Sequence, residues 1–306
     1  MSTAQGLQVA VEPIADEYVV AAVEGTGARV VGLDEARVLV WLGEVADFPE
    51  LPDGIEWVAL KSAGIEGYLS AGVVDDNRIW TNASGFYAEN VAEHALALLL
   101  AGLRQIHTAV RDHWNKVPID TSVRTLRGAT VAIIGAGGIG ASLIPRLSAC
   151  GATILAVNHS GRPVDGAAQT LPSSRLDEVW PRADHVILAA PSTPETHHMI
   201  NESSLAALPA HCWIVNVARG PLIDQQALYW ALRGGQIAGA ALDVTDPEPP
   251  AADDPLWSLP NCIITPHVAN PSSGLTRELA PWVARNIEKF VAGEQLLATV
   301  SVKRDY

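Results

Sequence analysis

The sequence lacks a long apolar run, is poor in cysteine and carries few basic residues. No stretch reaches the about 18 consecutive apolar residues that a membrane-spanning helix needs, so we expect no membrane partner. Lysine and arginine number 20 against 34 aspartate and glutamate residues, a formal net charge of -14. Such an acidic surface repels nucleic-acid phosphates, so nucleic acid is not expected as a partner either, and small-molecule chemistry is favoured.

The three cysteines, Cys150, Cys212 and Cys262, are an odd number and have no metal-ligand spacing. We expect them to be buried free thiols in a reducing compartment. The first residues show no basic flank followed by a long apolar stretch, which also favours a cytoplasmic location. Because no HExxH or similar spacing occurs among the nine histidines, a metal enzyme is not favoured.

A chain of 306 residues is long enough for two domains. Short β-branched runs that begin at Leu7, Ala28, Arg37, Glu56 and Arg78 predict a small α/β domain with a parallel sheet. Six near-continuous apolar strands follow further along the chain and predict a doubly wound sheet. Their sequences are TVAII, TILAVN, HVILAA, CWIVNV, AGAALD and CIITP.

Three further segments carry helical or irregular patterns. Residues 89–110 are apolar over nearly the whole helical circumference, which predicts a helix buried between domains or subunits. Residues 120–127 are polar and are expected to be irregular, whereas residues 274–293 have helical periodicity and can return to pack on the first domain.

A glycine-rich motif, GAGGIG, stands between the strand TVAII and a helical segment. Gly135, Gly137 and Gly140 then permit a tight turn, close approach of the backbone to a pyrophosphate, and close packing of helix on strand. Gly138 and Ile139 open the helix, whose free amides and positive dipole end face the phosphates. The alternative is a glycine-rich turn with no ligand, but strand, motif and helix in this order favour a dinucleotide site.

The residues after the next strand bear on the choice of dinucleotide. An NAD-preferring site commonly has Asp or Glu there to hold the ribose hydroxyls, but this sequence has Asn158, followed by Ser160 and Arg162. An uncharged residue removes repulsion and an arginine adds a permanently charged donor fork, so NADP is preferred and NAD stays possible. The alternative is a solvated loop arginine beside a tolerated asparagine.

Three polar residues follow strands of the second series, where ligands of doubly wound sheets gather. They are Arg219 in NVARG, Glu248 in LDVTDPEP and His267 in TPHVAN. An arginine can clamp the carboxylate of a 2-keto acid, and a histidinium can supply a proton as hydride reaches the carbon. A carboxylate bonded to the imidazole would fix its tautomer and favour its charged form. Each residue alone is more often structural; their shared position favours catalysis.

These residues resemble the D-isomer-specific 2-hydroxyacid dehydrogenase family, which includes glyoxylate/hydroxypyruvate reductases and phosphoglycerate dehydrogenases. The similarity runs from Asn82 to His267 through NVAEHALALLLAGLR, LRGATVAIIGAGGIG, NVARGPLIDQQALYWAL and GAALDVTDPEP. It implies an α/β protein with a doubly wound Rossmann coenzyme domain, residues 101–276, inserted in a smaller flavodoxin-like substrate domain, residues 1–100 and 277–306. Arg219, Glu248 and His267 match the family's catalytic positions, and the helix from Glu89 would help form a homodimer.

The resemblance also implies roles for residues that carry no signal of their own. The substrate, a small 2-keto acid or 2-hydroxy acid, would be bound by Arg219, His267 and the backbone of Ala63 and Gly64. Cofactor contacts would come from Ala190, Pro191, Thr196, Val217, Ala218 and Asp243. Asp243, at a strand end, can alternatively cap a neighbouring turn.

Several features limit what the resemblance implies. The N-terminal segment before Glu56 has no recognisable motif, so substrate specificity does not follow from any subfamily. The sequence also shows no long C-terminal extension of the kind that would form a regulatory domain, so none is expected. A dinucleotide-binding regulatory or corepressor-like protein with little turnover remains the alternative function. Reduction of an imino acid or another carbonyl compound would use the same hydride chemistry.

Overall fold

The computed structural model describes residues 4–300, which form two compact units. Within the described part, residues 4–87 and 271–300 make the first unit and residues 88–270 the second. The domain boundary expected between residues 100 and 101 falls inside helix α3 (Ala88–Leu103), which belongs to the second unit because it packs on α6 (Gly138–Ala149) and β10 (Trp213–Asn216). Each unit is described by itself.

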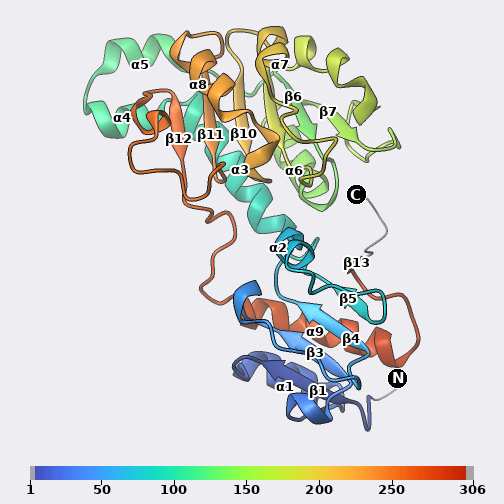
Figure 1. Ribbon diagram of the computed structural model, residues 1–306. Coiled ribbons are helices and arrows are strands. Elements are labelled where there is room, and N and C mark those ends of the chain that lie inside the picture. The colour runs from blue at the N-terminus through green and yellow to red at the C-terminus, as the bar shows by residue number, and fades with distance from the viewer. Residues whose placement is uncertain (1–3, 301–306) are drawn as a thin grey trace. The chain divides into compact units, whose positions relative to one another are not determined.

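The first unit is built on a six-stranded sheet in which β13 alone is antiparallel (Figure 1). The five strands expected here are confirmed, and the two-residue β13 is additional. In sheet order the strands are β13 (Thr299–Val300), β5 (Ile79–Thr81), β4 (Trp57–Leu60), β3 (Val38–Trp41), β1 (Gln8–Glu12) and β2 (Arg29–Val30). The helices are α1 (Glu17–Gly25), α2 (Glu66–Ser70) and α9 (Leu275–Val291), with 3-10 turns η1 (Leu33–Glu35) and η2 (Val45–Asp47).

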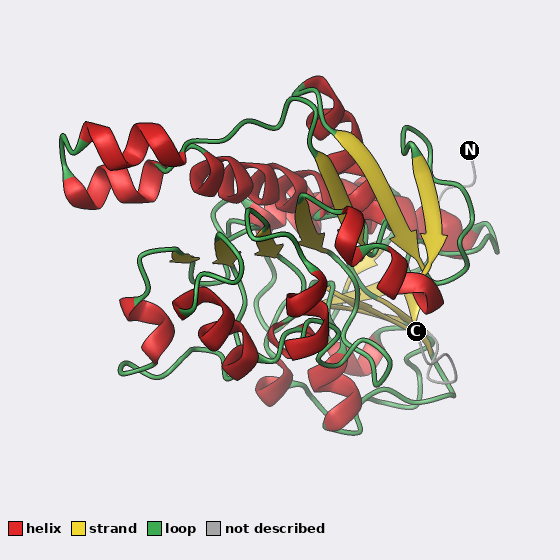
Figure 2. Ribbon diagram, turned by 90° about the horizontal axis from the view of Figure 1, so that it is seen from above, coloured by secondary structure: helices red, strands yellow, loops and turns green. Residues whose placement is uncertain are grey.

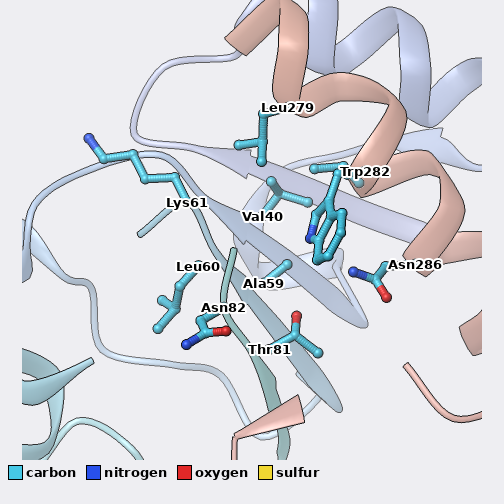
Figure 3. Close-up of a pocket in the computed structure, with 10 residues that line it drawn as sticks. Val40, Ala59, Leu60, Lys61, Thr81, Asn82, Leu279, Trp282 and Asn286 are labelled. Atoms are coloured by element: carbon cyan, nitrogen blue, oxygen red, sulfur yellow. The ribbon is translucent and has the colours of Figure 1, made fainter. Parts of the chain in front are cut away.

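Both faces of this sheet are buried, as expected of parallel strands. Alternate residues of β3 show it: Val38 and Val40 pack in the cluster that includes α1 and α9, whereas Leu39 and Trp41 pack in a cluster with Tyr68 of α2. A small pocket of about 10 Å³ lies between β3–β5 and α9, with Thr81 and other polar groups on its wall (Figure 3). No site residue proposed above lines it.

The second unit is built on a seven-stranded parallel sheet (Figure 1). The six expected strands are confirmed, and the sequence pattern missed β8, a short edge strand in which only Leu171 is buried. In sheet order the strands are β12 (Cys262–Ile264), β11 (Gly239–Leu242), β10, β9 (His185–Leu188), β6 (Thr130–Ile134), β7 (Thr153–Asn158) and β8 (Gln169–Pro172). The chain runs outward from β6 to one edge and from β9 to the other, so the order reverses between β6 and β9, where doubly wound sheets bind ligands.

The remaining helices of this unit differ in two places from expectation. The helix predicted over residues 89–110 ends at Leu103 because Gln105 adopts a left-handed conformation, and a separate helix follows. Residues 120–122, expected to be irregular, complete α5, which lies beside α4 (Figure 2). The remaining helices are α4 (Ile106–Asp112), α5 (Lys116–Ser122), α7 (Glu202–Ala207) and α8 (Gln225–Arg233), with η3 (Ser173–Glu178), η4 (Trp180–Arg182), η5 (Gly220–Leu222) and η6 (Pro255–Ser258).

The cysteines and the helices bear on two further expectations. All three cysteines are free, as expected, but only Cys212 is fully buried; Cys150, at the end of α6, is exposed, contrary to the expectation of buried thiols. In the described part of the chain, no helix combines the length and apolar character needed to cross a membrane.

Candidate active site

The three glycines after β6 have three different surroundings. Gly135 has a φ of +94°, and a Cβ there would lie 2.4 Å from the amide nitrogen of Ala190, so only glycine fits. Gly137 stands at the N-cap position of α6 without a side chain to cap the helix, and nothing lies within 4 Å of its Cβ position, which leaves its backbone open to a ligand. At Gly140 a Cβ would lie 3.3 Å from the Ile133 side chain, so the helix packs closely on the strand. This arrangement suits a pyrophosphate at the helix N-terminus.

The loop after β9 adjoins this turn. Ala190 lies against Gly135, and Pro191 follows it. The Thr196 hydroxyl donates to the Pro191 carbonyl at 2.8 Å and accepts from the Thr193 amide at 2.8 Å. Ala190, Pro191 and Thr196 therefore form one closed loop beside the glycine turn, at the point where the strand order reverses.

The loop after β7 is organised by Asn158. Its Oδ1 accepts from the Gly161 amide at 2.6 Å, and its Nδ2 donates to the Arg162 carbonyl at 2.8 Å. The exposed Arg162 side chain donates from Nε to the Ser160 hydroxyl at 3.2 Å. The loop thus presents a hydroxyl and a guanidinium side by side, with no carboxylate among residues 158–162.

His267 and Glu248 meet as predicted. His267 follows β12, Glu248 follows β11, and the imidazole Nδ1 lies 2.6 Å from Glu248 Oε1. The other carboxylate oxygen accepts from the Thr245 amide at 3.4 Å. Both side chains are about half exposed, at 52% and 41%. Because an ionised carboxylate only accepts, Nδ1 carries the proton and Nε2 is the nitrogen left for a substrate.

Arg219 is brought to the same edge of the sheet by a close backbone approach. It directly precedes Gly220, where a Cβ would lie 1.9 Å from the carbonyl oxygen of Thr245, so the loop after β10 packs on the segment that leads to Glu248. Asn216, which is fully buried at the end of β10, donates to the Arg219 carbonyl at 2.8 Å and accepts from the Ala218 amide at 3.0 Å.

Val217 and Asp243 occupy strand ends between these loops. The Val217 amide donates to the Leu188 carbonyl at 3.3 Å, which ties the end of β10 to β9. The carboxylate of Asp243 is buried and accepts from the backbone amides of Val268 and Ala269 at 3.0 and 2.9 Å. The turn-capping alternative for Asp243 is therefore observed, and a cofactor contact would be an additional role.

Ala63 and Gly64 belong to the first unit, in the loop after β4. Asn82 Nδ2 donates to the Ala63 carbonyl at 2.6 Å, and the Ser62 hydroxyl donates to the Gly64 carbonyl at 2.8 Å. The Tyr87 hydroxyl donates to the Lys61 carbonyl, and burial raises the pKa of Tyr87 to about 12, so it remains a donor at neutral pH. The carbonyl groups of Lys61, Ala63 and Gly64 therefore all accept hydrogen bonds from side chains within the first unit.

Sequence reasoning missed several residues that hold the site. Asn216 ends β10 directly before the predicted Val217. A polar residue at the end of an apolar run is a signal that could have identified it. Gly220 follows Arg219, and its close approach to the Thr245 backbone is apparent only in the folded structure. Thr265 and His94 contact each other across 171 positions, which no local pattern reveals.

Comparison with known proteins identifies the family. Residues 94–269 match the model for the D-isomer specific 2-hydroxyacid dehydrogenase, NAD binding domain. An uncharacterized protein in the proB 3'region of Corynebacterium melassecola is 40% identical over 95% of this chain and 97% of its own length.

Two solved structures share the fold. A D-isomer specific 2-hydroxyacid dehydrogenase from Xanthobacter autotrophicus Py2, in complex with NADPH and MES, has a TM-score of 0.81, 27% identity and coverage of 99% of this chain and 100% of that chain. An NADPH-dependent glyoxylate/hydroxypyruvate reductase from Sinorhizobium meliloti, in complex with NADP and sulfate, has a TM-score of 0.81, 25% identity and coverage of 96% and 98%. The chain therefore belongs to the D-isomer-specific 2-hydroxyacid dehydrogenases, oxidoreductases that act on CH–OH donors with a nicotinamide dinucleotide.

Proposed function

We propose that this protein reduces a small 2-keto acid, such as glyoxylate or hydroxypyruvate, to its D-2-hydroxy acid with NADPH. The observation that carries the proposal is the 2.6 Å contact between His267 Nδ1 and Glu248 Oε1, on loops that follow adjacent strands. Arg219 supports it from the neighbouring strand β10, through the close approach of Gly220 to Thr245.

Each polar group has a distinct role in this proposal. Glu248 fixes Nδ1–H of His267 and stabilises the imidazolium, so Nε2 delivers a proton to the keto oxygen during reduction and accepts it in the reverse direction. The Arg219 guanidinium binds the substrate carboxylate and polarises the keto oxygen. The backbone of Ala63 and Gly64 contributes to carboxylate binding, by resemblance to the family.

The residues after β6 fit a dinucleotide. The open Gly137 and the uncapped start of α6, at Gly138 and Ile139, would hold the pyrophosphate. Closer to the nicotinamide would lie Ala190, Pro191, Thr196, Val217, Ala218 and Asp243. A bound nicotinamide supplies the hydride, and the chain's own groups supply the proton and the orientation of the substrate.

The loop after β7 favours NADP over NAD. Arg162 and Ser160 offer donors to a 2′-phosphate, and Asn158 adds no negative charge to repel it. The two solved relatives described above contain NADPH or NADP. NAD use at lower affinity remains compatible with the neutral Asn158.

A homodimer is part of the proposal. The α4–α5 pair stands at the edge of the second unit (Figure 2). Large apolar side chains in and between these two helices are exposed. Trp114 is 93% exposed and Val110 77%, and a monomer gains nothing by leaving such a group of apolar side chains in water. Trp114→Ser together with Val110→Ser should shift the mass measured by light scattering from dimer to monomer; an unchanged mass would place the interface elsewhere.

The experiment that tests the function follows the absorbance of the reduced nicotinamide. Purified protein is mixed with NADPH or NADH and a panel of 2-keto acids, with imino acids as a comparison. Loss of NADPH that depends on a keto acid would support the proposal and rank the two cofactors. Tight NADPH binding without turnover across the panel would favour the regulatory alternative instead.

A further inference from the structure

The loop that carries His267 is wrapped around Asp243. The Asp243 carbonyl accepts from the His267 amide at 2.9 Å, and its carboxylate accepts from the next two amides of the loop. The Thr265 hydroxyl donates to Asp243 Oδ1 at 2.6 Å. His267 itself has a φ of +50°, a backbone conformation that residues other than glycine seldom adopt unless their surroundings impose it. The position of the imidazole therefore depends on this set of hydrogen bonds.

His94 on helix α3 adds a side chain from a distant part of the chain. Its Nε2 lies 3.1 Å from Thr265 Oγ1 and 3.3 Å from Asp243 Oδ1. The single hydroxyl proton of Thr265 goes to Asp243, so Thr265 Oγ1 accepts from His94, and Nε2 carries a proton. This direction places one N–H against the two acceptors that orient the loop. The Asp243 side chain is 1% exposed, so little water can replace that donor.

The same face of α3 holds the end of the loop. Asn90 lies one helical turn before His94, and its Nδ2 donates to Asn270 Oδ1 at 2.9 Å. Thr265 and Asn270 flank His267, so His94 and Asn90, one turn apart on α3, contact the two ends of the loop. α3 is buried against α6 and β10 and gives these two side chains a fixed base.

We infer that His94 is a positioning residue for His267, acting through Thr265 and Asp243, with Asn90 as its second anchor. The inference rests on the proposed function, because it assigns His267 the proton transfer. His94 does not touch the substrate in this scheme. It keeps the loop in the one arrangement in which His267 reaches Glu248, and a displacement of the imidazole of about 1 Å can cost on the order of 100-fold in rate.

The test compares His94→Leu with His94→Gln. Leucine fills much of the volume but has no donor, whereas glutamine keeps an N–H near the place of Nε2. We expect His94→Leu to lower kcat by roughly 10- to 100-fold, with the Kd for NADPH changed by less than about threefold, and His94→Gln to recover most of the loss. Equal losses in both variants, or a normal kcat in His94→Leu, would overturn the inference.

Hydrogen–deuterium exchange of the holoenzyme with NADPH provides a readout that needs no substrate. In His94→Leu the amides of Val268 and Ala269 should exchange at least about tenfold faster, while β6 and β9 keep the wild-type rates; in His94→Gln the loop should stay protected. Faster exchange spread over the whole unit would instead make His94 a general packing residue. If the wild-type protein reduces no keto acid, the proposed function fails, and the exchange result still decides whether His94 holds the loop.

A second variant guards against loss of folding. Thr265→Val removes the bridging hydroxyl and keeps the shape of the side chain. If His94 acts in part through Thr265, the double variant should lose less activity than the two single losses combined, because both single variants remove the His94–Thr265 contact. Additive losses would contradict the inference. Should His94→Leu not fold, normal loop exchange in Thr265→Val would also overturn it.

Discussion

The glycine turn after β6 and the His267 loop after β12 lie at strand ends of the same sheet but are fixed by different means. The turn is shaped by the backbone: Gly135 and Gly140 leave no room for a side chain, and Gly137 leaves room for a ligand. The loop is shaped by side chains, with Asp243 at its centre and His94 behind it. A turn of the first kind is local, and a loop of the second kind depends on residues distant in sequence.

This difference predicts different responses to substitution. Damage to the turn should reach the fold and the cofactor, because the backbone of β6, β9 and α6 meets there. Damage to the His267 loop should reach the chemistry first, because residues 266–268 are exposed and the sheet does not depend on them.

The largest effect is expected at the loop. His267→Ala removes the group that transfers the proton, so kcat should fall by roughly 100- to 10,000-fold, which is about 3–5 kcal/mol in the barrier. The Kd for NADPH should change little, because the role is realised mainly in the transition state. Steady-state kinetics and a fluorescence titration with NADPH measure the two quantities. A parallel loss of binding and turnover would remove His267 from the proton-transfer role.

The next effect is expected at the turn, where two glycines serve as a matched pair. In Gly135→Ala the methyl group would need the space of the Ala190 backbone at a φ of +94°, so unfolding should become easier by roughly 2–5 kcal/mol. Gly137→Ala meets nothing within 4 Å at a negative φ, and should unfold like the wild type while binding NADPH more weakly. Thermal and denaturant melts with an NADPH titration check both. Equal stability of the two variants would refute the steric account of Gly135.

How far the sequence predicts each region follows from the same difference. The motif of Gly135 could be interpreted because strand, glycines and helix are contiguous, and the strand-end positions of Arg219, Glu248 and His267 predicted that they would gather at one edge. The roles of His94 and Gly220 could not be predicted, since they depend on Thr265 and Thr245, which the fold alone brings near. The helix break at Gln105 was missed because the apolar pattern continues past it. The edge strand β8 was missed because only one of its residues, Leu171, is buried, which gives too weak an apolar pattern.

A pH experiment tests the sheet that supports both regions. His185 in β9 is 2% exposed, and its Nδ1 accepts from the Trp213 amide at 3.3 Å, so it folds as the neutral ring. Burial lowers its pKa from 6.5 to about 4. As the pH falls, His185 is therefore protonated in the unfolded chain before it can be protonated in the folded chain. The free energy of unfolding is unaffected by this residue above pH 6.5 and falls by roughly 3 kcal/mol between pH 6.5 and 4.

Denaturant titrations from pH 7.5 to 4.5 measure that loss. The glycine turn and the His267 loop should weaken together, because β9 and β10 lie between the strands that carry them. His185→Asn keeps an acceptor for the Trp213 amide but does not titrate in this range, so its stability should depend less steeply on pH. A slope equal to that of the wild type would show that other groups carry the acid sensitivity.

The smallest effect concerns a loop that combines the two means of construction. The segment from Asn158 to Arg162 is turned by a glycine at φ +70° and held by the Asn158 side chain, yet the group proposed to bind the cofactor, Arg162, is exposed. Arg162→Ala should weaken NADPH binding by roughly 10- to 100-fold, the range of about 1.5–3 kcal/mol for a hydrogen bond to a charged group. NADH binding should stay within about twofold, and stability should be unchanged. Arg175→Ala, which removes the same charge from the exposed pair with Glu178, is the matched control and should leave both affinities as they are. If both substitutions weaken NADPH alike, overall charge rather than this loop selects the cofactor, and the loop after β7 would then be built for its own stability, as the glycine turn is, and not for recognition.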